Sequence, residues 1–98
     1  DLKKAVYLYE EAAKNGDGLA KAQLGMIYVN GLPGVVEKNE KKGYNFCWLA
    51  VEEGEVDGNA KKLAIAYLHG GVLPADLAKS AQFLSMERAE EQVINTLG

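Results

Sequence analysis

The stretch LGMIYVNG at residues 24–31 decides the fold, because it returns 39 residues later as LAIAYLHG at residues 63–70. A second pattern places a short polar residue three positions before a lysine, which a small residue follows. It opens residues 1–5 (DLKKA), 39–43 (NEKKG) and 76–80 (DLAKS). Self-similarity at a period of about 20–50 residues is the signature of a repeat architecture. We therefore predict repeat units that start near residues 1, 39 and 76.

The composition is that of one small packed domain, which we place over residues 1–98. Of the 98 residues, 48% are hydrophobic, enough to form a core and to exclude disorder. The net charge is −3 and the 11 basic residues are scattered, whereas nucleic-acid binding needs a concentrated basic face. No apolar run approaches the roughly 18 residues of a membrane-spanning helix. We therefore expect neither nucleic acid nor a membrane as the partner.

The first residue is Asp rather than Met, and no leader-like stretch follows it, so we expect a fragment of a longer chain. The single cysteine, Cys47, excludes an internal disulfide. This favours a reducing compartment such as the cytoplasm without assigning one. Cys47 lies in the most apolar segment of the chain, where thiolate formation is disfavoured. We interpret it as a core residue rather than a reactive thiol.

Helical periodicity runs through the whole chain, because apolar residues recur at steps of three and four and no segment alternates with period two. Asp1 is placed to cap the first helix, and Gly16 suits the left-handed residue at its end. Gly25 lies mid-helix, where glycine costs about 1 kcal/mol relative to alanine, so we expect a close helix crossing there. The predicted helices cover residues 2–15, 18–29, 40–53, 58–68 and 77 to at least 91. The fold is therefore all-α, and neighbouring helices must stack to bury their apolar stripes.

The residues that recur also carry a family resemblance. The stretch KAVYLYEEAAKNGD at 4–17, followed by the Leu-Gly-x-x-Tyr-x-x-Gly element of 24–31, resembles the Sel1-like repeat, a relative of the tetratricopeptide repeat. The resemblance is strongest over 1–31 and continues over 42–71. It implies a right-handed α-solenoid (an α-α superhelix) of about two and a half Sel1-like helix-turn-helix repeats. By analogy with tetratricopeptide arrays, the helix with the Leu-Gly-x-x-Tyr element is expected to face the concave side.

We expect the concave face to be a partner-binding surface, on the non-core side of helices 18–29 and 58–68. It combines apolar centres with an amide, an imidazole and two ammonium groups, which together can grip an extended or helical peptide. Its residues are Met26, Val29, Asn30, Lys61, Lys62, Ile65, Leu68 and His69. In the alternative interpretation, Met26 and Ile65 belong to the core and the polar side chains are only solvated.

A second candidate patch centres on Trp48, which stands where the first copy has Glu10. This position is usually polar and exposed in the repeat that the chain resembles. An indole here either packs on a neighbouring element or marks a partner contact, since tryptophan often anchors interfaces. Tyr44 lies one turn earlier on the same side and would enlarge the patch.

No group of residues suggests chemistry. His69 is the only histidine and has no Cys, His or carboxylate at ligand spacing, and nothing resembles a nucleophile with its base. We predict no metal, no cofactor and no catalytic activity.

The resemblance implies a non-catalytic protein–protein interaction module, an adaptor that binds a protein or peptide. Two alternatives stay open. One is a secreted Sel1-like binding protein or hydrolase acting on a cell-wall or β-lactam-like ligand, although the cysteine pairs of such proteins are missing. The other is a homo-oligomer joined through the end helices.

Overall fold

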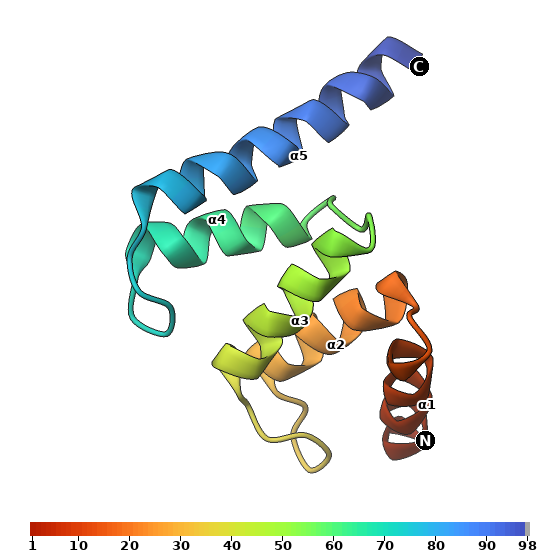
Figure 1. The fold of residues 1–98 in the computed structure, drawn as a ribbon. Helices are drawn as coiled ribbons and strands as arrows, with labels where there is room; N and C mark the ends of the chain where they lie inside the picture. Colours follow the sequence, from red (N-terminus) through yellow and green to blue (C-terminus); the bar gives the residue numbers. More distant parts are fainter. Residues whose placement is uncertain (98) are drawn as a thin grey trace.

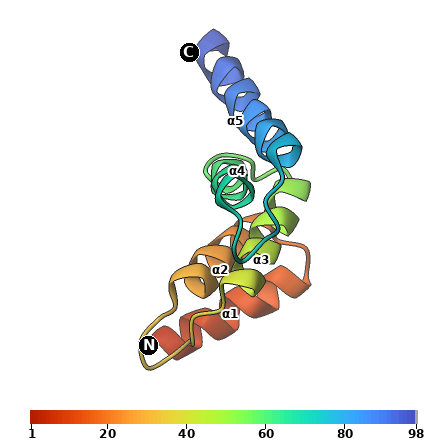
Figure 2. The same ribbon diagram turned by 90° about the vertical axis from the view of Figure 1, so that its left-hand side faces the viewer.

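The computed structural model describes the backbone of residues 1–97 and the side chains of residues 1–89. Five helices follow one another: α1 (Leu2–Lys14), α2 (Gly18–Asn30), α3 (Glu40–Glu52), α4 (Asn59–His69) and α5 (Leu77–Leu97). They are stacked in chain order, with α1 at one end and α5 at the other, and α5 extends beyond α4 (Figures 1 and 2). Over the described range the only β pairing is an isolated bridge between Leu32 and Val36. The predicted all-α helical solenoid is confirmed. The predicted ends of α1 to α4 differ from the observed ones by at most one residue, and α5 runs to Leu97, in line with the predicted end at 91 or later.

The crossing of α2 and α3 is the tightest feature of the stack. A Cβ atom added to Gly25 would lie 2.8 Å from Cys47 Sγ and 3.1 Å from the carbonyl oxygen of Gly43. A Cβ atom added to Gly43 would lie 2.6 Å from the backbone nitrogen of Val29 and 2.8 Å from the carbonyl oxygen of Gly25. The two helices therefore meet backbone to backbone, as the mid-helix glycine predicted.

The main core lies where α3, α4 and α5 meet. Its buried members are Cys47, Val51, Ala60, Leu63, Ala64 and Phe83. Cys47 is fully buried, and this burial raises the pKa of its thiol, although the charge of Lys62 acts in the opposite direction. The interpretation of Cys47 as a core residue is confirmed, since a neutral thiol is a poor nucleophile.

The first three helices are capped by their own N-terminal residues, and α4 is not. The side chains of Asp1, Asp17 and Asn39 accept hydrogen bonds from backbone N–H groups in the first turns of α1, α2 and α3. The N-cap of α4 is Gly58, which has no side chain to do so. Glu87 of α5 supplies the acceptor instead, because its Oε1 lies 2.6 Å from the Gly58 nitrogen. This contact ties α5 to the start of α4.

Replacing Glu87 with alanine should destabilise the protein by about 1.5–3 kcal/mol, the range for a hydrogen bond to a charged group. Glu87→Gln keeps an acceptor oxygen but loses the charge that favours a helix N-terminus, so we expect an intermediate loss. Urea unfolding followed by circular dichroism measures both. The control is Arg88→Ala at the neighbouring exposed position, which should change stability by less than about 0.5 kcal/mol. Equal stability of Glu87→Ala and the wild type would contradict the capping role.

Candidate docking groove

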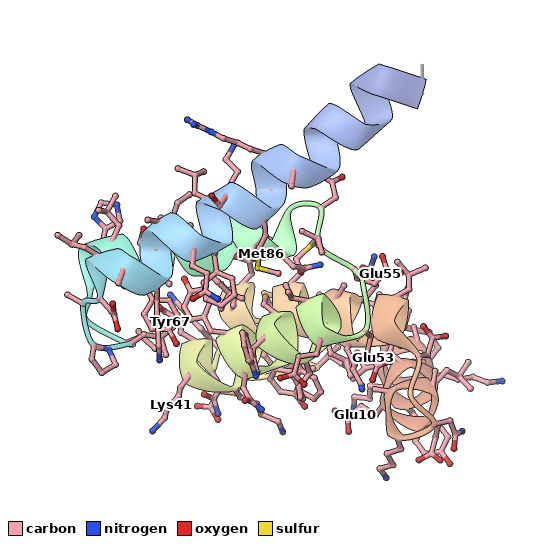
Figure 3. The ribbon with its side chains drawn as sticks, turned by 45° about the horizontal axis from the view of Figure 1, so that its top comes forward. Glu10, Lys41, Glu53, Glu55, Tyr67 and Met86 are labelled. Atoms are coloured by element: carbon pink, nitrogen blue, oxygen red, sulfur yellow. The ribbon has the colours of Figure 1, made fainter. Side chains whose placement is uncertain are left out.

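A groove of about 650 Å³ lies between α3 and α5, with α4 at its base. We call it the α3–α5 groove. Its lining residues are Asn39, Lys41, Lys42, Tyr44, Asn45 and Trp48 on the α3 side, Leu63 and Tyr67 from α4, Leu73 from the following loop, and Lys79, Gln82 and Phe83 from α5. Figure 3 shows Tyr67 in the space between α3 and α5, and Lys41 extending outward from the start of α3. Because three helices contribute, the groove depends on their stacking.

One wall of the groove is a chain of aromatic rings. Trp48 meets Phe83 edge to face, with ring centroids 5.5 Å apart and planes at 90°. Phe83 in turn stacks on Tyr67, with centroids 5.9 Å apart and planes at 4°. Both arrangements suit the quadrupoles of aromatic rings. Trp48 is nevertheless 42% exposed. The indole therefore packs on a neighbouring helix, as one of the two interpretations expected, and it also offers open surface. Its role as a partner contact stays a prediction.

The rim of the groove is cationic. Lys41, Lys42 and Lys79 line it, and none of the described side chains that line it is a carboxylate. The Nζ atom of Lys79 lies 5.3 Å from the centroid of the Tyr67 ring, in reach of a cation–π interaction. A chain with a net charge of −3 thus gathers positive charge around its aromatic groove.

The preceding repeat contains an equivalent but smaller groove of about 460 Å³, lined by residues that include Val6, Glu10, Tyr28 and Lys42. Here the Oη atom of Tyr28 donates a hydrogen bond of 2.6 Å to Glu10 Oε1. The Nζ atom of Lys42 lies 4.3 Å from the Tyr28 ring centroid, and the ring stacks on Phe46 at 5.8 Å. A tyrosine and a lysine therefore line both grooves, and a phenylalanine stacks on the tyrosine in each, whereas only the first groove is lined by carboxylates.

The residues predicted for the concave face have a different location. Met26 and Ile65 are 44% and 48% exposed, so they do not belong to the core. Leu68, Asn30, Lys61 and His69 are also exposed, and Val29 and Lys62 are half-buried. None of the eight lines the α3–α5 groove, and Asn30 lines a separate cavity formed with the loop that follows α2.

The second predicted patch falls into the groove, because Tyr44 and Trp48 both line it. Sequence reasoning missed the residues that complete it, chiefly Lys79 and Phe83 from α5 and Leu73 from the loop before it. Alignment of the repeats could have identified two of them, since Lys79 and Phe83 are at the positions that Lys42 and Phe46 occupy in the preceding copy.

Within the described residues, no three His, Cys, Asp or Glu side chains are grouped so that they could hold a metal ion. None of the helices in the described part of the chain combines the length and the apolar character that crossing a membrane requires.

The stacked helical pairs and the open groove define a helical-repeat protein. The family model of the Sel1 repeat matches residues 1–17, 18–55 and 60–86, and the chain therefore belongs to the Sel1 repeat family. The second match covers the pair α2–α3, and the third covers α4 and the part of α5 that ends at Met86. Sel1 repeats are generally non-catalytic modules for protein interaction.

One solved structure similar to this chain is the crystal structure of a Sel1 repeat protein from Oxalobacter formigenes. The two share 21% sequence identity, the comparison covers 86% of this chain and 89% of that one, and the TM-score is 0.44. No curated protein matches the chain.

Alkaline pH should weaken the fold, because three groups near the α2–α3 packing have raised pKa values. The hydrogen bond to Glu10, followed by burial, raises the pKa of Tyr28 above 10.0, and burial does the same for Tyr44. Burial raises the pKa of Cys47 above 9.0. The unfolded chain therefore releases these protons first, so their stabilising effect is complete below about pH 8 and is lost as the pH rises through the native pKa values.

We expect the urea midpoint to fall between about pH 8 and pH 11, which spans the ordinary pKa values of Cys and Tyr. Tyr28→Phe removes one of the three groups and should make the fall shallower. It should also lower stability at neutral pH by about 1 kcal/mol through loss of its hydrogen bond. A midpoint that stays constant or rises over this range would contradict the assignment.

Proposed function

We propose that this chain is a non-catalytic interaction module that binds a peptide segment of a partner protein in the α3–α5 groove. The observation that carries the proposal is the exposed Trp48, held by Phe83 at the mouth of a groove that three helices build. Tryptophan and tyrosine are enriched at the energetic centres of interfaces, where a fixed ring provides a large contact area at low entropic cost.

The dimensions of the groove favour a peptide. A volume of about 650 Å³ lies within the range of roughly 300–1,000 Å³ that small ligand sites occupy, enough for a few side chains. The lining alternates apolar rings with amides and ammonium groups, so a bound segment would meet both packing and hydrogen-bonding partners. Asn45 of α3 and Gln82 of α5 both line the groove and are candidate partners for the peptide backbone.

The surface of α2 and α4 that carries Met26, Ile65 and Leu68 remains the competing site. Its three apolar side chains are all more than 40% exposed. They lack the enclosing walls of the α3–α5 groove, so less of a bound peptide would be removed from water.

Peptide display tests the proposal and separates the two surfaces. A random peptide library would be selected on the wild type and then tested on the pair Tyr44→Ala/Trp48→Ala and on the pair Met26→Ser/Ile65→Ser, each checked for helicity by circular dichroism. We expect the selected peptides to lose binding to the first pair and to keep it with the second. Peptides that behave in the opposite way would move the site to α2 and α4. If selection yields no peptide that binds the wild type in solution, the proposal is wrong.

Self-association is a second candidate function, favoured by the apolar surface at the α1 end. The side chains of Leu2, Tyr7, Leu8 and Leu19 are each more than half exposed there. Such a surface is typical of a contact with another protein surface. Light scattering over a range of concentrations should show a dimer that Leu8→Ser/Leu19→Ser abolishes, and a constant monomer mass would exclude this function.

A further inference from the structure

We propose that the α3–α5 groove is selective for an acidic peptide, one carboxylate of which takes the place that Glu10 holds in the preceding repeat. The inference rests on the proposed function, since it names the chemistry of the peptide that the groove would bind. It is drawn from a comparison of the two repeat-related grooves.

In the first groove, a carboxylate of the chain itself completes the site. Glu10 accepts the hydrogen bond from the Tyr28 hydroxyl at 2.6 Å, beside the Lys42 ammonium group over the Tyr28 ring. The lining there contains two carboxylates, Glu10 and Glu37, and two ammonium groups, Lys38 and Lys42. The charges of this first groove are therefore balanced within the molecule.

In the second groove, the same framework lacks its anion. Tyr67 takes the place of Tyr28, stacked on Phe83, and the Lys79 ammonium group lies over its ring at 5.3 Å. The position of Glu10 is taken by Trp48, whose ring turns onto Phe83. Lys41 and Lys79 line it together with Lys42, whose Nζ atom lies over Tyr28 of the first groove, and among its described side chains no carboxylate balances Lys41 and Lys79. The groove is also larger, at about 650 Å³ against about 460 Å³.

A carboxylate of a bound ligand therefore fits the α3–α5 groove beside Tyr67 and Lys79 in both charge and hydrogen bonding. It could accept from the Tyr67 hydroxyl, as Glu10 accepts from Tyr28, and lie near Lys79. Exposed ion pairs are individually weak, so one pair would not hold a ligand. Several acidic residues around one apolar side chain would use Lys41 and Lys79 together with the Trp48 and Phe83 rings. The apolar part of this contact distinguishes a peptide from a free anion.

Two synthetic peptides with blocked ends test the selectivity: Glu-Glu-Leu-Glu-Glu and its uncharged counterpart Gln-Gln-Leu-Gln-Gln. Each would be titrated into the ¹⁵N-labelled protein while amide shifts are recorded. We expect saturable shifts in residues 41–48 and 79–83, with the acidic peptide binding about tenfold more tightly, the effect of two or three exposed ion pairs. Lys79→Ala should weaken binding of the acidic peptide several-fold and binding of the uncharged peptide to a smaller extent. Lys3→Ala, at an exposed lysine of α1 outside the groove, is the matched control and should alter neither.

A substitution at Trp48 tests the repeat comparison itself. Trp48→Glu restores the carboxylate of the first repeat and should abolish binding of the acidic peptide. Trp48→Gln introduces a side chain of nearly the same size as glutamate but without its charge. This variant should keep the preference for the acidic peptide, although both peptides should bind it more weakly than they bind the wild type. If Trp48→Glu does not fold, Lys79→Glu places a carboxylate at the opposite wall and carries the same expectation.

Each outcome has a defined meaning. If both peptides bind the groove equally, or if peptides selected by display bind there but carry no acidic residues, selectivity for acid is wrong and the peptide-binding function stands. If oligothymidine, a polyanion of another class, shifts the groove residues and the acidic peptide does not, selectivity for an acidic peptide is wrong. Absence of any display-selected peptide in the groove would instead overturn the proposed function. Preference for the acidic peptide, lost in Trp48→Glu and kept in Trp48→Gln, would support the inference.

Discussion

Replacing Gly43 with alanine should destabilise this protein by about 1–3 kcal/mol, the cost of overpacking a site that cannot relax. At an exposed helical position the same change stabilises by about 1 kcal/mol, because alanine is the better helix former. At Gly43 the sign reverses, since the new methyl group would lie 2.6 Å from the backbone nitrogen of Val29 and 2.8 Å from the Gly25 carbonyl oxygen. A side chain could turn away, but two backbone segments can separate only if α2 and α3 move apart.

Urea unfolding of Gly43→Ala followed by circular dichroism measures this effect. Asn45→Ala is the matched control, because position 45 is exposed on the same helix and gains helix propensity without a contact of this kind. We expect the control to be neutral or slightly stabilising. A Gly43→Ala protein as stable as the control would show that α2 and α3 are not in backbone contact. The third copy has Ser80 at this position, where its hydroxyl donates to the Ala64 carbonyl oxygen at 2.7 Å, so the α4–α5 crossing leaves room for a side chain.

The five helices could be predicted from the sequence, and so could one of the two glycines, Gly25, at which α2 and α3 cross. Periodicity located all five helices, because each buries one stripe against its neighbours and the stripe is visible in the residue order. Gly25 indicated a close approach because a mid-helix glycine is unfavourable unless packing requires it. Its partner Gly43 gave no such signal, since a small residue after a lysine resembled the ordinary start of a repeat.

The groove was harder to predict, because its character comes from three helices. The periodicity of apolar residues indicates which face of a helix is buried, but it does not indicate which exposed faces of different helices lie opposite each other across a groove. Lys79 was therefore noted only as part of the repeat start at residues 76–80, although it lies over Tyr67. Trp48 was recognisable because an aromatic residue replaced Glu10 of the first copy, and comparing two copies at one position identifies such a departure. The cap of α4 by Glu87 joins residues 29 positions apart, beyond the reach of any local capping rule.

Leu63→Ala should lower the free energy of unfolding by about 2–5 kcal/mol, the range for truncation of a buried leucine. Leu63 is 1% exposed and lies in the cluster that joins Cys47 of α3 to Phe83 of α5. A domain of this size has a total stability of about 5–15 kcal/mol, so the loss would be a substantial fraction of it. Because the same side chain lines the α3–α5 groove, its removal should also loosen the aromatic wall.

Leu68→Ala is the control, since Leu68 lies on the same helix but is 52% exposed. Truncation there should cost less than about 0.5 kcal/mol. The two variants remove the same atoms from α4 and make the same change in helix propensity, so the difference between their urea midpoints isolates burial.

Leu24 is the equivalent residue of the preceding repeat, and its side chain is 0% exposed. The loss of stability in Leu24→Ala should therefore fall in the range expected for Leu63→Ala. Similar losses at 24 and 63 would show that both copies use this leucine to join neighbouring helices, as a stack stabilised by nearest-neighbour contacts requires. If Leu63→Ala costs no more than Leu68→Ala, the core does not lie where α3, α4 and α5 meet.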